Sequence, residues 1–170
     1  MQNNKTEYWL RGPVEGIPAL LQPVVHALLQ ANDEIREIVT DFPKENLWLK
    51  PAGVASVGFH LQHIAGVLGR LFTYSKGESL SETQLHYLSN EGKENESLEP
   101  QNLATALQHQ IDISIEHLKT VTEDTLTQVR YVGRKQMPST VIGLLFHAAE
   151  HTMRHTGQLL VTARVLAEPL

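Results

Sequence analysis

Apolar residues recur at intervals of three and four along four segments of the chain. The first segment begins at about residue 18 or 23 and ends at residue 42, and the other three span about residues 57–76, 101–121 and 138–165. Such spacing gathers the apolar side chains on one face of an α-helix, which can then pack against other helices. Ser56 and Gly77 are typical of the start and the end of a helix, here the second one. The pattern predicts an all-α protein with four long helices.

A long polar tract, residues 78–100, separates the second predicted helix from the third. It contains only a short helical piece, near Leu85, Tyr87 and Leu88. Loops of this length inside a compact domain usually form a crossover or a lid. A second connection, residues 122–137, includes a strand-like alternation at residues 129–132 that we expect to be too short to build a sheet.

The long crossover decides the predicted directions of the helices. It can carry the chain back along the molecule, so that the third helix runs parallel to the second. We therefore expect a four-helix bundle with an up-down-down-up order. At 170 residues the chain has an ordinary size for one domain with a hydrophobic core, so residues 1–170 are predicted to form a single domain.

Composition excludes several classes of protein. The net charge is -5, and no basic block provides the electrostatic footprint of a nucleic-acid-binding protein. The absence of cysteine excludes disulfides and thiolate ligands. Residues 1–7 are polar, and no apolar run is long enough to span a bilayer. We therefore expect no signal peptide, no membrane contact and a cytoplasmic location.

His147, His151 and His155 stand at a strict four-residue spacing in the fourth predicted helix. Each step of four residues advances about 400° around a helix, so neighbouring members lie one turn apart on nearly the same face. Two such imidazoles can hold one metal ion, and catalytic zinc sites use three protein ligands with one position left open. The third ligand must come from another segment.

The best source of a third ligand is the part of the second predicted helix that contains His60 and His63. If this helix and the fourth run antiparallel, His63 and His155 are each about ten residues from the same end of the bundle. Parallel helices would separate His63 from the histidine pair by about 9 Å. The spacing leaves His60 open as an alternative ligand.

Residues 147–151 also fit H-x-x-E-H, the inverted zinc-peptidase signature in which the glutamate is the general base. This motif needs another carboxylate ligand well downstream, where Glu168 is the sole acid. Glu150 lies about 100° from His151 around a helix, so the two side chains cannot face the same ion. We therefore disfavour a peptidase and expect His147 to lie behind the ligands or to face the substrate.

The sequence resembles the DinB/YfiT-like family, in order, over nearly the whole chain. The resemblance is most specific in residues 56–66, 70–74 and 151–158. It implies a four-helix bundle in which His63, His151 and His155 bind a divalent metal ion, zinc or nickel. Known activities in the family are metal-dependent hydrolysis and thiol-dependent transfer or isomerisation, and many members are dimers, so we expect a homodimer. Arg154 departs from the family pattern, in which two adjacent histidines often precede Gly-Gln.

The chemistry of such a site follows from its charge. Three neutral imidazoles leave a bound ion its full charge, so that the ion lowers the pKa of a bound water or thiol. Any thiol must be a cosubstrate, because the chain has no cysteine. We expect a hydrolase or low-molecular-weight-thiol transferase acting on a small molecule, with Arg70, His147 and Gln158 as candidate helpers. Two alternatives stay open: a non-catalytic bundle that binds metal or a small molecule, and a structural bundle without an ion.

Overall fold

The structure is a computed structural model that describes residues 6–167. Within this range the fold is mostly helical, with five α-helices and one small two-stranded sheet. The long helices are α1 (Gln22–Val39), α2 (Val57–Ser75), α4 (Pro100–Leu118) and α5 (Val141–Ala167). The short helix α3 (Glu82–Asn90) lies in the long connection between α2 and α4. The all-α prediction is therefore right for the bulk of the chain.

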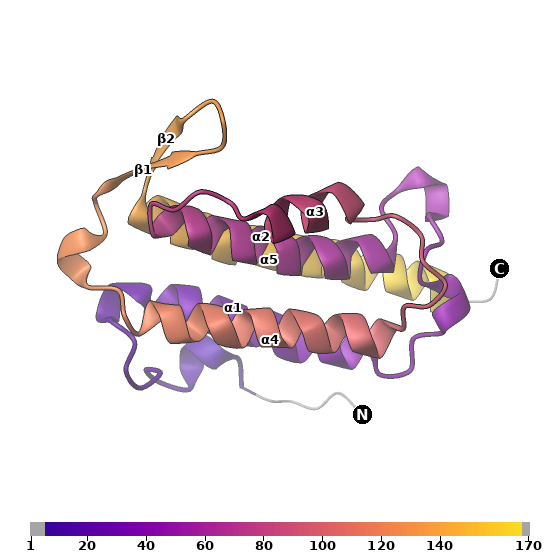
Figure 1. Cartoon of the computed structure of the whole chain (residues 1–170). Helices are drawn as coiled ribbons and strands as arrows, with labels where there is room; N and C mark the ends of the chain where they lie inside the picture. Colours follow the sequence, from indigo (N-terminus) through magenta and orange to yellow (C-terminus); the bar gives the residue numbers. More distant parts are fainter. Residues whose placement is uncertain (1–5, 168–170) are drawn as a thin grey trace.

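The four long helices pack in two layers. Helix α2 contacts α5 and α4, and α1 contacts the same two helices. Figure 1 shows α2 and α5 in one layer and α1 and α4 in the other. Each helix contributes fully buried leucines to a shared core, among them Leu28, Leu61, Leu107 and Leu145. Burial of each such side chain contributes about 1.5–3 kcal/mol, which makes this core the main source of stability.

Contacts at the helix ends show how the helices run. The Gln101 side chain donates a hydrogen bond to the Val39 carbonyl at 3.1 Å, so α4 begins beside the end of α1. Arg130 Nε donates to the Ser75 carbonyl at 2.8 Å, which places the segment leading into α5 beside the end of α2. Helices α2 and α5 therefore run in opposite directions.

The start of α5 differs from the prediction. Residues 129–132 are not an isolated alternation, because β1 (Val129–Val132) pairs with β2 (Met137–Thr140) in an antiparallel hairpin. Gly133 adopts a φ of 65° at the turn, a conformation that glycine tolerates well. Pro138 lies in β2, and α5 begins at Val141 rather than near Pro138. The expectation that this segment is too short for a sheet was wrong, since its partner lies only a turn away.

The start and end of α2 match the sequence signals. The Ser56 hydroxyl accepts a hydrogen bond from the Phe59 backbone N–H at 3.2 Å, as expected of a helix N-cap. Gly77 follows the helix with a φ of 79°. The short helical piece expected near Leu85 is α3, which begins with a capping box between Ser81 and Gln84.

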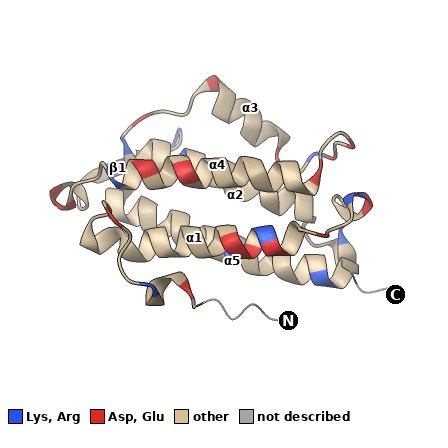
Figure 2. Ribbon diagram, turned by 90° about the horizontal axis from the view of Figure 1, so that it is seen from below, with Lys and Arg blue, Asp and Glu red and all other residues tan. Residues whose placement is uncertain are grey.

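Charged residues are scattered over the molecule. Figure 2 shows Lys, Arg, Asp and Glu distributed among helices and loops, with no helix basic along its length. Among residues 6–167, no helix is both long enough and apolar enough to cross a membrane.

Candidate metal centre

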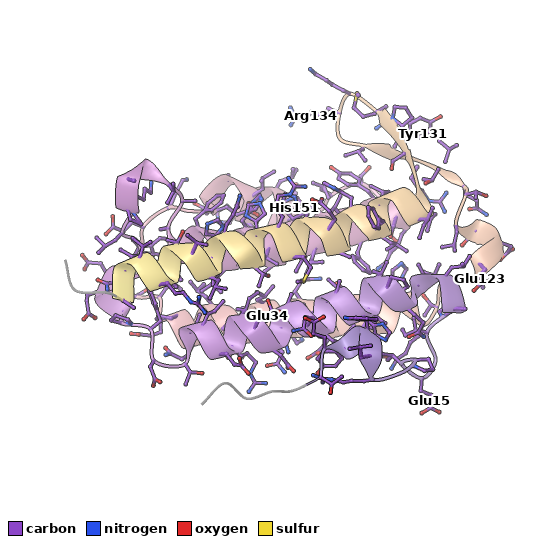
Figure 3. All side chains as sticks on the ribbon, turned by 180° about the vertical axis from the view of Figure 1, so that it is seen from behind. Glu15, Glu34, Glu123, Tyr131, Arg134 and His151 are labelled. Carbon is purple, nitrogen blue, oxygen red and sulfur yellow. The ribbon has the colours of Figure 1, made fainter. Side chains whose placement is uncertain are left out.

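His63 of α2 meets His151 and His155 of α5. Each of these residues offers a nitrogen, and the three nitrogens lie within 4.8 Å of one another. Nε2 of His63 lies 3.0 Å from Nε2 of His151, and the rings of His151 and His155 have centroids 4.5 Å apart. In Figure 3, His151 lies on the side of α5 that is turned away from α1. The structure thus brings together the three histidines that the family resemblance selects.

The packing of α5 allows this meeting. The buried positions beside the histidines carry short side chains, namely Ala148, Ala149, Thr152 and Thr156. Short side chains at a helix contact permit a close approach of the two helices. On the α2 side, the Phe59 ring stacks on the His63 ring with centroids 4.9 Å apart and planes at 15°. This stacking restrains the orientation of the His63 ring.

The electrostatics of the cluster favour neutral imidazoles. Burial, and secondarily the neighbouring histidines, lowers the pKa of His60 to about 4. The same two causes lower the pKa of His151 and of His155 to about 4. At neutral pH these rings therefore carry lone pairs, and the neutral imidazole is the form that binds a metal ion.

The two nitrogens of each ring have different surroundings. His63 Nδ1 lies 2.8 Å from Oε2 of Glu91, so Nδ1 carries the proton and Nε2 is left with the lone pair. His155 Nδ1 lies 3.0 Å from Nδ1 of His60, which is 3% exposed. His151 Nδ1 is buried with no hydrogen-bond partner among the described residues, so this ring is engaged only through Nε2.

These observations fit a divalent transition metal ion. Imidazole nitrogens suit zinc, nickel, copper and iron, whereas calcium and magnesium prefer oxygen ligands. Two Nε2 atoms 3.0 Å apart require a proton or a cation between their lone pairs. His63, His151 and His155 are the residues that would hold such an ion.

Glu91 belongs to the site but was not predicted from the sequence. Its side chain is 5% exposed and forms ion pairs with both His63 and Arg70. Burial opposes ionisation, but the hydrogen bonds with His63 and Arg70 outweigh it and lower the pKa of the Glu91 carboxyl. Its position in a polar tract, 28 residues from His63, gave no sign of this contact.

Two of the candidate helpers are engaged with carboxylates. Arg70 is buried at 8% exposure and is paired with Glu91. His147 is half exposed, and its Nδ1 lies 3.3 Å from Oε2 of Glu150. The His147 ring lies beside that of His151, with centroids 5.3 Å apart, on the solvent side of the cluster.

An open pocket of about 560 Å³ lies one turn beyond His155 along α5. The Gln158 side chain lines it and makes no hydrogen bond to the cluster within residues 6–167. Space at Gly157 is open, because a Cβ there would meet nothing within 4 Å. The pocket is lined by Val54, Ala55, His60, Arg154, Gly157, Gln158, Val161 and Thr162. Its apolar wall adjoins the histidine cluster through His60.

The geometry gives no support to the peptidase motif. The Glu150 carboxylate accepts hydrogen bonds from Arg154, with 2.8 Å between Nε and Oε1, and so is engaged along the helix surface. Glu168, the carboxylate that the motif would need, lies outside the described residues.

The fold and the cluster together define a candidate metalloprotein with a helical scaffold. The family model of the DinB superfamily matches residues 27–159, and the chain belongs to this superfamily. The matched region contains all three clustered histidines, and the resemblance seen in the sequence is confirmed.

A solved structure shares the fold. This chain is similar to the crystal structure of the conserved protein of locus from Enterococcus faecalis, with a TM-score of 0.68 and 19% identity. The similarity covers 85% of this chain and 95% of that chain. A comparison with curated proteins finds no match.

Proposed function

We propose that this protein is a metal-dependent enzyme that holds zinc or nickel through His63, His151 and His155 and acts on a small molecule. The observation that carries the proposal is the convergence of three imidazole nitrogens within 4.8 Å. The expected reaction is hydrolysis or transfer of a low-molecular-weight thiol, as in the family that the sequence resembles. A thiol would be a cosubstrate, since the chain has no cysteine.

The chain's own residues have distinct parts in this proposal. The bound ion would act as a Lewis acid that lowers the pKa of a ligand and polarises the substrate. His60 and Glu91 orient the imidazoles of His155 and His63 through their Nδ1 atoms. The apolar pocket beside His60 receives the body of the substrate, and Gln158 offers it an amide.

The scaffold that we propose for this site is a single-domain four-helix bundle in up-down-down-up order. The contacts of Gln101 with Val39 and of Arg130 with Ser75 support this order, because they fix which helix ends adjoin. A cytoplasmic homodimer that binds neither nucleic acid nor membrane is the assembly that we expect.

A specific observation favours a second function, that of a non-catalytic metal or small-molecule binder. The two carboxylates nearest the cluster are both engaged, Glu91 by Arg70 and Glu150 by Arg154. Among the described residues, neither acid is therefore free to serve as a general base. Under this alternative, the protein retains metal but turns over no substrate.

Metal analysis of untagged protein tests the proposal. Wild type is expected to retain about one equivalent of zinc or nickel, whereas His63→Ala and His151→Ala lose it, because two ligands hold an ion poorly. His109→Ala is the matched control, since His109 is exposed on α4. His117→Ala is a second control and should also retain metal. Equal retention in all variants would contradict the three-histidine site.

An activity screen separates the enzyme from the binder. Metal-loaded protein is incubated with several low-molecular-weight thiols and electrophiles, and separately with ester and amide substrates, with and without chelator. Turnover that disappears with the chelator and in His151→Ala supports the enzyme. Stoichiometric metal without any turnover supports the non-catalytic binder.

A further inference from the structure

The crossover connection brings one carboxylate back onto α2. Oε2 of Glu91 lies 2.8 Å from His63 Nδ1, and Oε1 accepts a hydrogen bond from Nη1 of Arg70. Oε2 also accepts a longer hydrogen bond from Nη2 of Arg70, at 3.3 Å. Oε1 therefore faces the guanidinium, whereas Oε2 has His63 as its nearer partner. Because the carboxylate is 5% exposed, water does not compete strongly for either contact.

The surface of α2 is shaped to receive this carboxylate. Gly66 lies one turn after His63, and a Cβ added there would collide with Oε1 of Glu91. The same Cβ would lie 2.9 Å from Cε1 of Tyr87 in α3. A glycine within a helix costs about 1 kcal/mol relative to alanine, so its presence is explained by the space that Glu91 and Tyr87 occupy.

Further hydrogen bonds hold the connection in register. The Gly92 N–H donates to Oε1 of Gln62 at 2.8 Å, and the Tyr87 hydroxyl donates to the Gln62 carbonyl at 3.1 Å. Gln84 Nε2 donates to Oγ1 of Thr73 at 2.8 Å. These contacts lie on both sides of Glu91 along the chain, so its carboxylate is placed by the docked connection as a whole.

We propose that Glu91 is a positioning residue that fixes the proton of His63 on Nδ1, so that Nε2 is always free to bind the ion. This inference rests on the proposed metal site, and it adds a determinant of metal affinity that lies outside the three ligands. Carboxylates that accept from a ligating histidine typically change metal affinity by about 10- to 100-fold when removed.

The contacts of Glu91 make Glu91→Gln a sharp test. Arg70 has only N–H donors, and its nearer contact is with Oε1, so the amide oxygen of the glutamine is expected at the Oε1 position. The amide NH₂ then faces His63 Nδ1 as a donor and requires a lone pair there. The proton of His63 is thereby moved to Nε2, the nitrogen that must bind the ion. Glu91→Gln should therefore invert the tautomer with almost no change in side-chain volume.

The experiment measures metal affinity and tautomer separately. Zinc and nickel affinities are measured by competition with a chromophoric chelator, and the tautomer of His63 is read from ¹⁵N shifts of the metal-free protein. Glu94→Gln is the matched control, because Glu94 is an exposed acid of the same connection. We expect Glu91→Gln to weaken metal binding by about 10- to 100-fold and to move the His63 proton to Nε2, with Glu94→Gln unchanged.

A second pair of variants tests the same claim without changing Glu91. Gly66→Ala should displace the carboxylate and weaken metal binding in the same direction as Glu91→Gln. Gly69→Ala is its control one turn along α2, where the atom nearest to an added Cβ is Oε1 at the end of the Gln110 side chain, at 3.3 Å. This pair remains informative if Glu91→Gln leaves the buried Arg70 charge unpaired and fails to fold.

The outcomes distinguish this inference from the proposed function. Wild-type affinity together with an unchanged His63 tautomer in Glu91→Gln overturns the role of Glu91. If wild type binds no metal, the proposed function fails, while the tautomer of the metal-free variants still shows whether Glu91 holds the His63 proton.

Discussion

The Nδ1 atoms of His60 and His155 lie 3.0 Å apart, and one of the two rings must donate a proton to the other. His60 is almost fully buried and does not belong to the group of three converging nitrogens. It lies behind His155 and orients the ring. This relationship favours a positioning role for His60 over the role of ligand that the sequence left open.

His60→Ala should therefore weaken metal binding without abolishing it. We expect a loss of about 10- to 100-fold in affinity, since His155 keeps its ligating nitrogen but loses its partner. Chelator competition measures the change, and His86→Ala is the control, because His86 is exposed and its ring contacts Asn90 of the same short helix. Complete loss of metal in His60→Ala, with retention in His63→Ala, would make His60 the ligand.

The stability of the metal-free protein should fall as the pH is lowered from about 6.5 to about 4. His60, His151 and His155 have a pKa of about 4 in the folded protein, against 6.5 for an unperturbed histidine. Between these values the unfolded chain binds more protons, so acid favours unfolding. The stabilisation is complete above the unfolded pKa and is lost as the pH falls through this window.

Urea unfolding between pH 8 and pH 4 measures this dependence. His151→Gln removes one of the three shifted groups, so its free energy of unfolding should vary less with pH than that of wild type. Parallel curves for the two proteins would show that His151 is not held neutral by the fold.

Glu150→Gln should leave metal retention and any hydrolytic activity unchanged. The Glu150 carboxylate pairs with Arg154 on the surface of α5 and does not face the three nitrogens. The inverted peptidase motif requires the opposite result, because its glutamate is the general base. Turnover by metal-loaded protein is the measurement, and a large fall in turnover at constant metal content would restore that motif.

Gly58→Ala should destabilise the protein by about 1–3 kcal/mol, the usual cost of overpacking. A Cβ at this position would lie 2.6 Å from Cζ3 of Trp48, whose ring covers the start of α2. Gly157→Ala is the matched control in a helix, where an added Cβ meets nothing within 4 Å and alanine should stabilise by up to about 1 kcal/mol. Chemical denaturation compares the two variants.

The periodic pattern predicted the long helices because most of their length is amphipathic. It also predicted that the histidine pair of α5 shares one face, since residues four apart lie one turn apart on nearly the same side of a helix. The third histidine followed from a choice of antiparallel helices together with the family resemblance. In the structure, α2 and α5 do run in opposite directions.

Glu91 could not be predicted in the same way. Its contact with His63 depends on the path of a polar connection across α2, and that path is set by docking at Gly66 and Gln62. Gly66 is a residue of α2 whose type reflects this docking, but a glycine in a helix does not by itself show which segment packs against it.

The hairpin at residues 129–140 was not predicted, because strands of four residues are too short for their hydrophobic pattern to show which segment they pair with.

The antiparallel meeting of α2 and α5 has a consequence for the order of assembly. Two of the three nitrogens belong to the last helix of the described chain, 88 residues or more beyond the first. When α1, α2 and α4 have left the ribosome, the partial protein therefore carries only one of the three clustered histidines, His63. Loading of the proposed metal ion must await synthesis of α5, so its incorporation would report that the nascent polypeptide has closed around its final helix.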